Sequence, residues 1–485
     1  MGSVINDSEL TAQPWDFVVI GGGTAGLVAS RTAASFGARV LLIEADRLGG
    51  DCLWTGCVPS KSLIAAAHAA STALRSQELG VHAEGAAVDF SAVMNHVHTA
   101  MHTIAPVDSA ESLERDGVAV LRGSARFRDG RTLIVDGRTI RFRQAMIATG
   151  SRPRALGMEG AAALTVLTSD SLWNLTEQPE RILVVGGGPI GCELGQALAR
   201  LGSQVTLVQR NKRLIPKESE AAEAIISAAL AADGVDVRKG RAVRRIETID
   251  GKSGSLSLDD GTVLEFDRML VSIGRIADTR SLALDNAGVT IDDRGTVIVD
   301  DSLRTTNKRI WAAGDVTALP QFTHTAGVNG SIAASNAMLG LRRTIDRRAL
   351  PRVTFTQPEV ATVGLQAADA VPSKHQIVTI DHRDLDRAIT EAAISGFTQI
   401  VTDHKGVLLG ATIVGPRAGE SLAEVTLAVK NRLNAGQIAG TTHPYPTYND
   451  AVWKAALAIV RVRLDSGLLL RAIRVLAAIR RVRVK

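Results

Sequence analysis

The first half of the chain alternates short, continuous apolar runs with longer stretches that contain many alanines. Residues 17–20 and 40–43 are entirely apolar, and the stretch 27–36 between them is rich in alanine. Such short runs predict buried strands, and the stretch between them predicts a helix. The same order recurs over residues 182–208. Strands that alternate with helices predict an α/β fold built on parallel sheets.

Glycines separate the first predicted strand from the first predicted helix in a fixed pattern. Gly21, Gly23 and Gly26 have the spacing of a dinucleotide-binding fingerprint, and Glu44 ends the second strand. We expect Gly21 to make the turn, Gly23 to let the backbone approach a pyrophosphate and Gly26 to let helix and strand pack closely. The helix N-terminus would bind the pyrophosphate, and Glu44 would accept a hydrogen bond from a ribose hydroxyl.

A second fingerprint follows the same order but ends differently. Its glycines are Gly186, Gly188 and Gly191. Gln209 stands where the first fingerprint has an acid, and three cations follow it: Arg210, Lys212 and Arg213. An acid would repel a 2′-phosphate, whereas these cations would attract one, so we expect NADPH in preference to NADH. The alternative is that the cations only form a solvated face. Two fingerprints in one chain predict two dinucleotides that exchange electrons.

Composition is that of a folded protein with several domains. The chain has 485 residues, of which 45% are apolar and 22% charged. A chain of this length is too long to fold around a single hydrophobic core, so we expect more than one domain. No apolar run approaches the roughly 20 residues of a membrane-spanning helix, and residues 1–14 lack the pattern of a secretory signal. We therefore expect a cytoplasmic protein.

Residues 454–485 carry a net charge of +8 although the whole chain carries +5, so the main body is slightly acidic and no nucleic-acid partner is expected.

Two of the three cysteines follow the first fingerprint closely. Cys52 and Cys57 are separated by four residues, and Lys61 comes shortly after them. Two inert core thiols would be the simplest interpretation, and a zinc half-site would need a second ligand cluster, which the sequence lacks. Beside a dinucleotide site, a reversible disulfide is the better interpretation, and Lys61 would favour a thiolate or an anionic flavin. Asp315, after the apolar run 310–313, would bring a carboxylate to the first cofactor, although such acids are more often structural.

These motifs together resemble the FAD-dependent pyridine nucleotide–disulfide oxidoreductases, the family of dihydrolipoamide dehydrogenase, glutathione reductase and mercuric reductase. The resemblance extends from Asp16 to about Lys454 and includes both fingerprints and the Cys-x4-Cys-Val-Pro-Ser-Lys block. It also includes Ala-Thr-Gly at 148–150, Gly-Arg at 274–275 and Ala-Gly-Asp at 313–315. The form Gly-Asp-Cys-Leu-Trp-Thr-Gly-Cys is most similar to mercuric-reductase-like members.

The resemblance implies cofactors, a partner and roles for the site residues. The family uses FAD and NAD(P)H and is homodimeric, and the C-terminal domain of one subunit completes the active site of the other. Cys57 would lie against the flavin, and Cys52 would exchange with a small-molecule disulfide or another electron acceptor. Glu193 would pair with Lys61 near the nicotinamide. Further residues would contact the cofactors: Gly50, Ala125, Gly150, Asp315 and Gly274.

The C-terminal acid–base motif of the family is altered in this chain. Disulfide reductases carry His-Pro-Thr-x-x-Glu, whereas here Tyr445 takes the place of the histidine and Asp450 that of the glutamate, with His443 two residues earlier. An unperturbed tyrosine has a pKa of about 10 and is a poor base near neutral pH. Mercuric reductases resemble this chain in using a tyrosine, but they add a C-terminal cysteine pair, and no cysteine follows Cys192. We therefore expect neither an efficient metal relay nor fast turnover of common disulfides; Tyr445 or His443 would do the acid–base work.

We expect three domains and a tail. An FAD-binding domain over 1–165 and 276–345 would enclose an NAD(P)-binding domain over 166–275, followed by an α+β dimerisation domain over 346–465. The tail, 466–485, predicts a helix with Arg471, Arg474, Arg481 and Lys485 on one face and Leu468, Ala472, Val475, Leu476 and Ile479 on the other. Such a helix would lie on the anionic inner face of a membrane, and a solvated or dimer-packing helix is an equal alternative.

The predicted reaction is hydride transfer from NAD(P)H to FAD, reduction of the Cys52–Cys57 disulfide, and thiol–disulfide exchange with the acceptor. Two other functions stay open. In one, electrons leave from the flavin to a quinone or a metal ion and the cysteines are auxiliary. In the other, the protein is a membrane-tethered redox sensor and not an enzyme.

Overall fold

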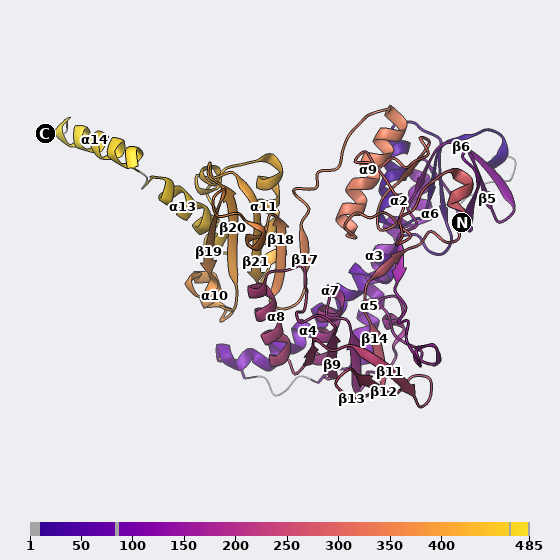
Figure 1. The fold of residues 1–485 in the computed structure, drawn as a ribbon, viewed down its shortest axis with the longest axis horizontal. Coiled ribbons are helices and arrows are strands. Elements are labelled where there is room, and N and C mark those ends of the chain that lie inside the picture. Colours follow the sequence, from indigo (N-terminus) through magenta and orange to yellow (C-terminus); the bar gives the residue numbers. More distant parts are fainter. Residues whose placement is uncertain (1–9, 83–86, 465–466, 484–485) are drawn as a thin grey trace. The chain divides into compact units, whose positions relative to one another are not determined.

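The computed structural model describes residues 10–82, 87–464 and 467–483 (Figure 1). The described residues form two compact units. Unit 1 takes those of the ranges 1–74, 83–212 and 234–345, and unit 2 takes those of 75–82, 213–233 and 346–485. Residues 213–233 therefore group with the C-terminal part of the chain, although the sequence assigns them to the NAD(P)-binding domain; the predicted domain boundaries stay a prediction.

The first sheet of unit 1 is mainly parallel. Its strands run in the order β3-β2-β1-β6, and β16 pairs with the other side of β6. Their bounds are β1 (Trp15–Ile20), β2 (Val40–Glu44), β3 (Val118–Arg122), β6 (Arg138–Ile147) and β16 (Ile310–Ala312). The first half of β6 also pairs with the antiparallel β5 (Thr132–Val135), which pairs with β4 (Ala125–Asp129). The predicted strands of the first fingerprint are thus adjacent and parallel.

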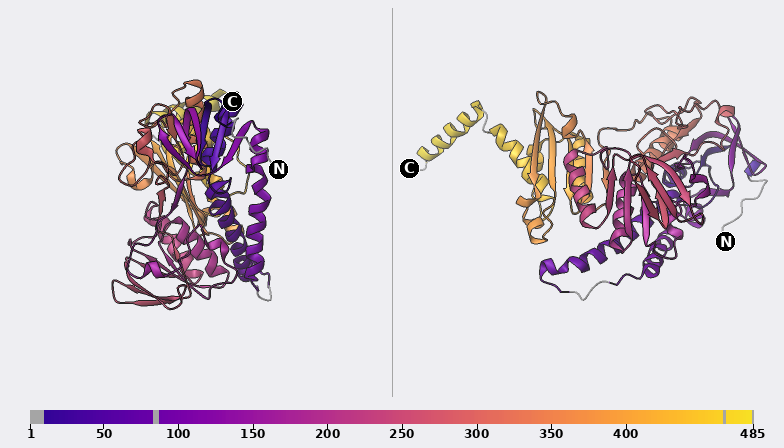
Figure 2. Two further views of the ribbon diagram at one scale, coloured as in Figure 1. Left: turned by 90° about the vertical axis from the view of Figure 1, so that its right-hand side faces the viewer. Right: turned by 60° about the horizontal axis from the view of Figure 1, so that its bottom comes forward.

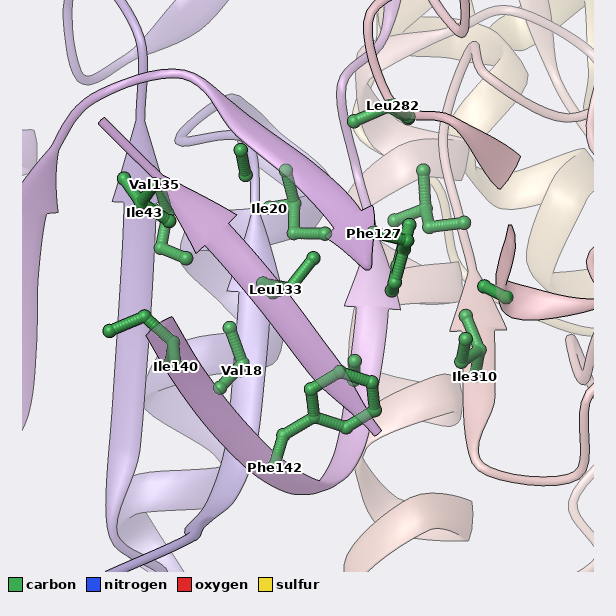
Figure 3. Close-up of a cluster of buried hydrophobic side chains, with 14 of the residues drawn as sticks. Val18, Ile20, Ile43, Phe127, Leu133, Val135, Ile140, Phe142, Leu282 and Ile310 are labelled. Atoms are coloured by element: carbon green, nitrogen blue, oxygen red, sulfur yellow. The ribbon is translucent and has the colours of Figure 1, made fainter. Parts of the chain in front are cut away.

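Both faces of this sheet are covered, which explains the continuous apolar runs. Val18 and Ile20 of β1 lie in a cluster with Phe127 and Phe142, whose rings meet edge to face with centroids 6.1 Å apart (Figure 3). The alternate residues of β1 pack into a second cluster with helix α2 (Thr24–Ser35) and helix α9 (Thr323–Leu339). The two helices approach so closely that a Cβ at Gly330 would lie 2.3 Å from the carbonyl oxygen of Ala25.

The second parallel sheet of unit 1 repeats the first pattern. Its strands run in the order β10-β9-β8-β14, and α7 (Pro189–Arg200) connects β8 to β9. Their bounds are β8 (Arg181–Val185), β9 (Gln204–Gln209), β10 (Asp236–Lys239) and β14 (Arg268–Val271). Two small antiparallel sheets complete the strands: β11 (Val243–Thr248), β12 (Gly254–Leu258) and β13 (Val263–Phe266), and β7 (Ser151–Pro153) with β15 (Arg275–Ala277). The remaining helices before α7 are α3 (Gly50–Trp54), α4 (Cys57–Arg75), α5 (Phe90–Ile104) and α6 (Ala110–Arg115).

Unit 2 is built on an antiparallel sheet in the order β17-β18-β21-β20-β19. Helices cover one face of this sheet (Figure 2) and share an apolar core with it: α11 (Ala418–Asn431), α12 (Ala435–Ala439) and α13 (Asp450–Leu464). The strands are β17 (Arg352–Thr354), β18 (Glu359–Gly364), β19 (His375–Asp381), β20 (Phe397–Asp403) and β21 (Leu408–Gly415). The unit also contains α8 (Glu220–Ala232), α10 (Asp386–Thr390) and α14 (Gly467–Arg483). The predicted α/β class with two nucleotide-binding sheets and an α+β C-terminal part is confirmed.

The predicted tail helix corresponds to α14, and Lys485 and the side chain of Leu468 lie outside what the structure describes. No helix in the described ranges combines the length and the apolar character needed to cross a bilayer.

Candidate functional site

The first fingerprint forms a tight turn between β1 and α2. Gly21 has a φ of +106°, which a residue with a side chain rarely adopts. A Cβ at Gly26 would lie 1.9 Å from the carbonyl oxygen of Gly21, so only glycine lets the helix start this close to the strand. The carboxylate of Glu44 accepts hydrogen bonds from the backbone N–H of Gly22 at 2.6 Å and of Asp46 at 2.7 Å. The acid is thereby fixed at the end of β2, beside the turn.

The space around this turn fits a dinucleotide. Gly23 caps α2 without a side-chain hydrogen bond, so the N–H groups of the first helical turn are left for an anion. A Cβ at Gly23 would have only the Cα of Gly50 within 4 Å, and one at Gly150 would have no atom that close. The hydroxyl of Thr325, in the first turn of α9, is buried and lacks a hydrogen-bond partner among the described residues. Open space, a free helix N-terminus and an unsatisfied hydroxyl are what a bound FAD would use.

Asp315 lies just beyond β16 and is the second acid of this region. Its carboxylate accepts a hydrogen bond from the Ser151 hydroxyl at 2.9 Å. Burial raises its pKa, and this hydrogen bond and the charge of Arg275 oppose the shift only in part. Two other predicted contact residues lie in the same unit: Ala125 is buried at the start of β4, and Gly274 precedes β15 with a φ of +110°. Asp315, Ala125 and Gly274 thus lie in the unit that contains the first fingerprint.

The second fingerprint has the same geometry with one chemical change. Gly186 has a φ of +113°, a Cβ at Gly191 would lie 1.9 Å from the carbonyl oxygen of Gly186, and the space around Gly188 is open. The side-chain oxygen of Gln209 accepts a hydrogen bond from the N–H of Gly187 at 3.3 Å, as Glu44 does from Gly22. The site therefore keeps the shape of the first one but replaces its carboxylate by an uncharged amide.

Cys52 lies in α3 and Cys57 begins α4, and both are free thiols. The Sγ of Cys57 lies 3.2 Å from the Thr323 hydroxyl at the start of α9. A hydrogen bond from Cys52 is the main cause that lowers the pKa of Cys57 to about 6; Thr323 and the charge of Lys61 add to it against the effect of burial. The same hydrogen bond and burial raise the pKa of Cys52. Cys57 is therefore the thiolate of the pair at neutral pH.

Lys61 and Glu193 join the two nucleotide-binding parts of unit 1. Lys61, on α4, donates a hydrogen bond from Nζ to Oε2 of Glu193, on α7, at 2.9 Å. Glu193 is 7% exposed, and a buried carboxylate needs such a partner. The structure thus brings together the two residues that the resemblance pairs.

In unit 2, the altered motif is held by residues other than those expected. Tyr445 is exposed, and its hydroxyl donates a short hydrogen bond to Asp386 and not to Asp450. This hydrogen bond to a carboxylate raises the pKa of Tyr445, so the phenol is a weaker acid than a free tyrosine and its basic phenolate form is rarer near neutral pH. Asp450 instead pairs with Lys454 on the next turn of α13, at 3.4 Å. Tyr445 and Asp450, which occupy the positions of the family's histidine and glutamate, therefore contact different partners.

His443 is engaged on both ring nitrogens. Nδ1 lies 2.9 Å from the carbonyl oxygen of Thr441, and Nε2 lies 3.0 Å from a carboxylate oxygen of Glu424. Asn449 also donates to Glu424, and the side chain of His443 is 7% exposed. His443 therefore fixes the loop that carries Tyr445, and neither ring nitrogen is open to a substrate in this arrangement.

Sequence reasoning missed several residues that shape these sites, among them Thr323, Asp386 and Glu424. Each acts from a segment far from its partner along the chain and belongs to no spaced motif, so the sequence offers no signal for it.

Across the part of the chain that the structure describes, no group of three His, Cys, Asp or Glu residues is arranged to hold a metal ion.

The chain matches two family models, and together they cover most of its length. Residues 15–330 match the pyridine nucleotide–disulphide oxidoreductase family, and residues 350–456 match the dimerisation domain of that family. A mercuric reductase of Streptomyces lividans is 36% identical over 459 residues, which cover 91% of this chain and 95% of the relative. A dihydrolipoyl dehydrogenase of Chlamydia pneumoniae is 34% identical over 451 residues, which cover 91% and 96%.

Solved structures agree with these matches. LpdA from Mycobacterium tuberculosis superposes with a TM-score of 0.84 at 27% identity, covering 92% of this chain and 99% of the other. The HOCl-induced flavoprotein disulfide reductase RclA from Escherichia coli gives 0.82 at 26% identity, with coverage of 91% and 99%.

Proposed function

The chain belongs to the pyridine nucleotide–disulphide oxidoreductases, and we propose that it carries electrons from NADPH to a reversible Cys52–Cys57 disulfide and from there to a disulfide or a related acceptor. It is a flavoprotein oxidoreductase that uses FAD and NAD(P)H, and it forms homodimers through the dimerisation domain. FAD, when bound, supplies the two-electron link between the nicotinamide and the cysteine pair. The observation that carries the proposal is the pair of free thiols Cys52 and Cys57, with the Sγ of Cys57 3.2 Å from the Thr323 hydroxyl, in the same unit as the two glycine-rich turns. The opposite pKa shifts of the two thiols agree with it.

We assign each glycine-rich turn and its neighbouring residues to one of the two cofactors. Gly21, Gly23, Gly26, Glu44 and Asp315 would hold FAD, in a domain over 1–165 and 276–345. Gly186, Gly188, Gly191 and Gln209 would hold NADPH, in a domain over 166–275. The shapes of the two turns and the open space at Gly23 and Gly188 support these assignments.

The cysteines divide the remaining chemistry. Cys52 would attack the acceptor disulfide and form a mixed disulfide with one half of it, and its proton would pass to the other half, which would leave as a thiol. Cys57 would then attack the mixed disulfide, release the second half and re-form the Cys52–Cys57 bond, so that two electrons pass to the acceptor. In the free thiols the hydrogen bond from Cys52 is the main cause that lowers the pKa of Cys57; once Cys52 is in the mixed disulfide, Thr323 and Lys61 would remain to stabilise the attacking thiolate. Tyr445 would stay protonated and would not act as a base, because its hydroxyl donates to Asp386 and this raises its pKa.

Counting thiols tests the proposal directly. Oxidised, FAD-loaded dimer is mixed with NADPH without oxygen, quenched with an alkylating reagent and analysed by mass spectrometry. NADPH should convert Cys52 and Cys57, and no other cysteine, from a disulfide into two alkylated thiols. Cys192, which is buried on α7, is the internal reference and should give the same signal with and without NADPH. A sample in which Cys52 and Cys57 are free thiols before and after NADPH contradicts the proposal.

Cofactor choice gives a second prediction. Gln209→Glu keeps the hydrogen bond to Gly187 but adds a negative charge where a 2′-phosphate would lie. We expect kcat/KM for NADPH to fall about tenfold or more, which corresponds to about 1.4 kcal/mol, and kcat/KM for NADH to stay or rise. Arg210→Ala should also weaken NADPH selectively, whereas Arg154→Ala, outside the fingerprint, should affect both cofactors equally. Wild-type protein that uses NADH as well as NADPH would contradict the preference.

We also propose that α14 binds the anionic cytoplasmic face of a membrane, where the enzyme would then work. The helix contains no acid and five arginines: Arg471, Arg474, Arg480, Arg481 and Arg483. Its apolar side chains Ile473, Val475, Leu476 and Ile479 are 40–64% exposed in the chain. Arginines attract anionic headgroups, and exposed apolar side chains can enter the interface between headgroups and acyl chains. The bulk of the chain carries no such charge excess, so binding should depend on the tail.

Vesicle binding tests this proposal. Full-length protein should sediment with vesicles that contain about 30% phosphatidylglycerol at low salt and should be released as the salt concentration rises. Arg474→Glu/Arg481→Glu should abolish sedimentation, and the matched Arg474→Lys/Arg481→Lys variant should retain it. Equal binding to neutral and anionic vesicles would contradict the proposal. So would a charge-reversal variant that changes only the oligomeric state, because α14 would then contact another subunit and not a membrane.

A further inference from the structure

Asp51 directly precedes Cys52, and its carboxylate is fixed from two sides. Its Oδ1 accepts a hydrogen bond from the Thr55 hydroxyl at 2.5 Å and lies 3.3 Å from a guanidinium nitrogen of Arg275. Its Oδ2 lies so near Gly56 that a Cβ there would be 3.0 Å away. The negative charge is therefore held in α3, directly before Cys52 and beside Thr55 and Gly56, which lead to Cys57.

Arg275 lies on β15, and all three nitrogens of its guanidinium contact polar groups. Its Nε donates to the Ser151 hydroxyl at 2.8 Å, and Nη2 donates to the Ser151 carbonyl oxygen at 2.9 Å in addition to its contact with Asp51. Its Nη1 donates to the Ser169 hydroxyl at 3.0 Å and lies 3.4 Å from Asp170. The guanidinium thus donates four hydrogen bonds and forms an ion pair with Asp51, and the side chain, which is 11% exposed, is held through all three of its nitrogens.

The segment from α3 to the start of α4, which includes Asp51, is held by further hydrogen bonds. The indole N–H of Trp173 donates to the carbonyl oxygen of Thr55 at 2.9 Å, and that of Trp54 donates to the carbonyl oxygen of Leu48 at 2.7 Å. Because these contacts fix the backbone between the cysteines, the distance from the Asp51 carboxylate to the thiols does not relax freely. A charge held at a fixed distance acts on the thiols through its field.

We propose that Asp51, held by Arg275, is a positioning residue that sets the reducing strength of the Cys52–Cys57 pair. The inference rests on the proposed redox role of that pair. A fixed carboxylate opposes the thiolate and so disfavours the reduced form, which makes the pair a stronger reductant; a pair whose reduced form is stabilised is a stronger oxidant. Arg275 limits the effect because its positive charge lies beside the carboxylate. The charge of Asp51 acts to raise the pKa of both thiols, in agreement with this direction, although for Cys57 the hydrogen bond from Cys52 outweighs it and lowers the pKa.

The test compares equilibrium constants with a glutathione buffer in the FAD-loaded dimer, measured by alkylation and mass spectrometry. Asp51→Asn keeps the shape and the hydrogen bond from Thr55 but removes the charge. We expect the balance between dithiol and disulfide to shift about three- to tenfold toward the dithiol, and the pH midpoint of alkylation to fall by about half a unit to one unit. Arg275→Met leaves the carboxylate uncompensated and should shift both quantities in the opposite direction. Asp170→Asn removes the other carboxylate at Arg275 and is the matched control, which should shift neither.

The outcomes separate the possibilities. The inference would be overturned if Asp51→Asn left the dithiol–disulfide equilibrium constant unchanged. It would also be overturned if Asp51→Asn and Arg275→Met shifted this constant in the same direction and both lowered the melting temperature, because the ion pair would then only support the local structure. Wild-type protein that forms no disulfide between Cys52 and Cys57 would refute the proposed function, and the inference with it. A disulfide that forms normally but has the same equilibrium constant in all variants overturns the inference alone.

Discussion

Cys57→Ser or Cys52→Ser is expected to lower turnover of disulfide acceptors by NADPH at least about a thousandfold. Neither variant can form the intramolecular disulfide, so no covalent route remains for two electrons to pass to the acceptor. Steady-state NADPH oxidation with a panel of small disulfides measures the effect. Cys192→Ser is the matched control, because Cys192 is buried on α7 and takes no part in the exchange. It should keep wild-type turnover.

The two serine variants also distinguish the rival functions. If the double variant Cys52→Ser/Cys57→Ser keeps full turnover with a quinone or a metal ion, electrons leave without the thiols and the cysteines are auxiliary. If the wild type shows negligible NADPH oxidation with every acceptor, a redox sensor is the better description. Cys57 adds a pH signature: with a pKa of about 6, its alkylation should be nearly independent of pH above about 7 and should slow tenfold per unit well below 6.

The nucleotide-binding parts were predictable from the sequence because their chemistry is local. A glycine that needs a positive φ, a glycine that allows close packing and an acid or amide at the next strand end all lie within one strand–helix–strand segment. The structure places Glu44 and Gln209 on equivalent backbone N–H groups, although the sequence only indicates that they occupy equivalent positions. Local backbone geometry is encoded by spacing, and spacing is visible in a single sequence.

The acid–base region was predictable only in part, because its contacts are long-range. The sequence identifies Tyr445 as an unusual residue, but it does not show that Asp386 accepts its hydrogen bond or that Glu424 binds His443. The same holds for Arg275, whose guanidinium reaches Asp51 from a strand far along the chain. Such pairs depend on which segments the fold brings together, and no periodicity or motif records them.

Alanine at Gly26 and alanine at Gly23 are expected to fail in different ways, although both residues belong to one fingerprint. The Cβ of Gly26→Ala would lie 1.9 Å from the carbonyl oxygen of Gly21, so α2 must move away from β1. Overpacking of this kind costs several kcal/mol, and we expect the melting temperature to fall by about 5–10 °C or the protein not to fold. Thermal unfolding of FAD-free protein, followed by circular dichroism, measures this change.

Gly23→Ala meets only the Cα of Gly50, at 3.9 Å, so the FAD-free protein should melt within about 2 °C of the wild type. The added methyl group would instead occupy the space through which a pyrophosphate approaches the N-terminus of α2, and we expect at least about a tenfold loss of FAD affinity. FAD content after purification and titration of the FAD-free protein measure the loss. Gly188→Ala, in the equivalent open position of the second fingerprint, is the matched control and should retain FAD while weakening NADPH. Equal loss of FAD in the Gly23 and Gly188 variants, or normal FAD content in Gly23→Ala, would contradict the assignment of the first fingerprint to FAD.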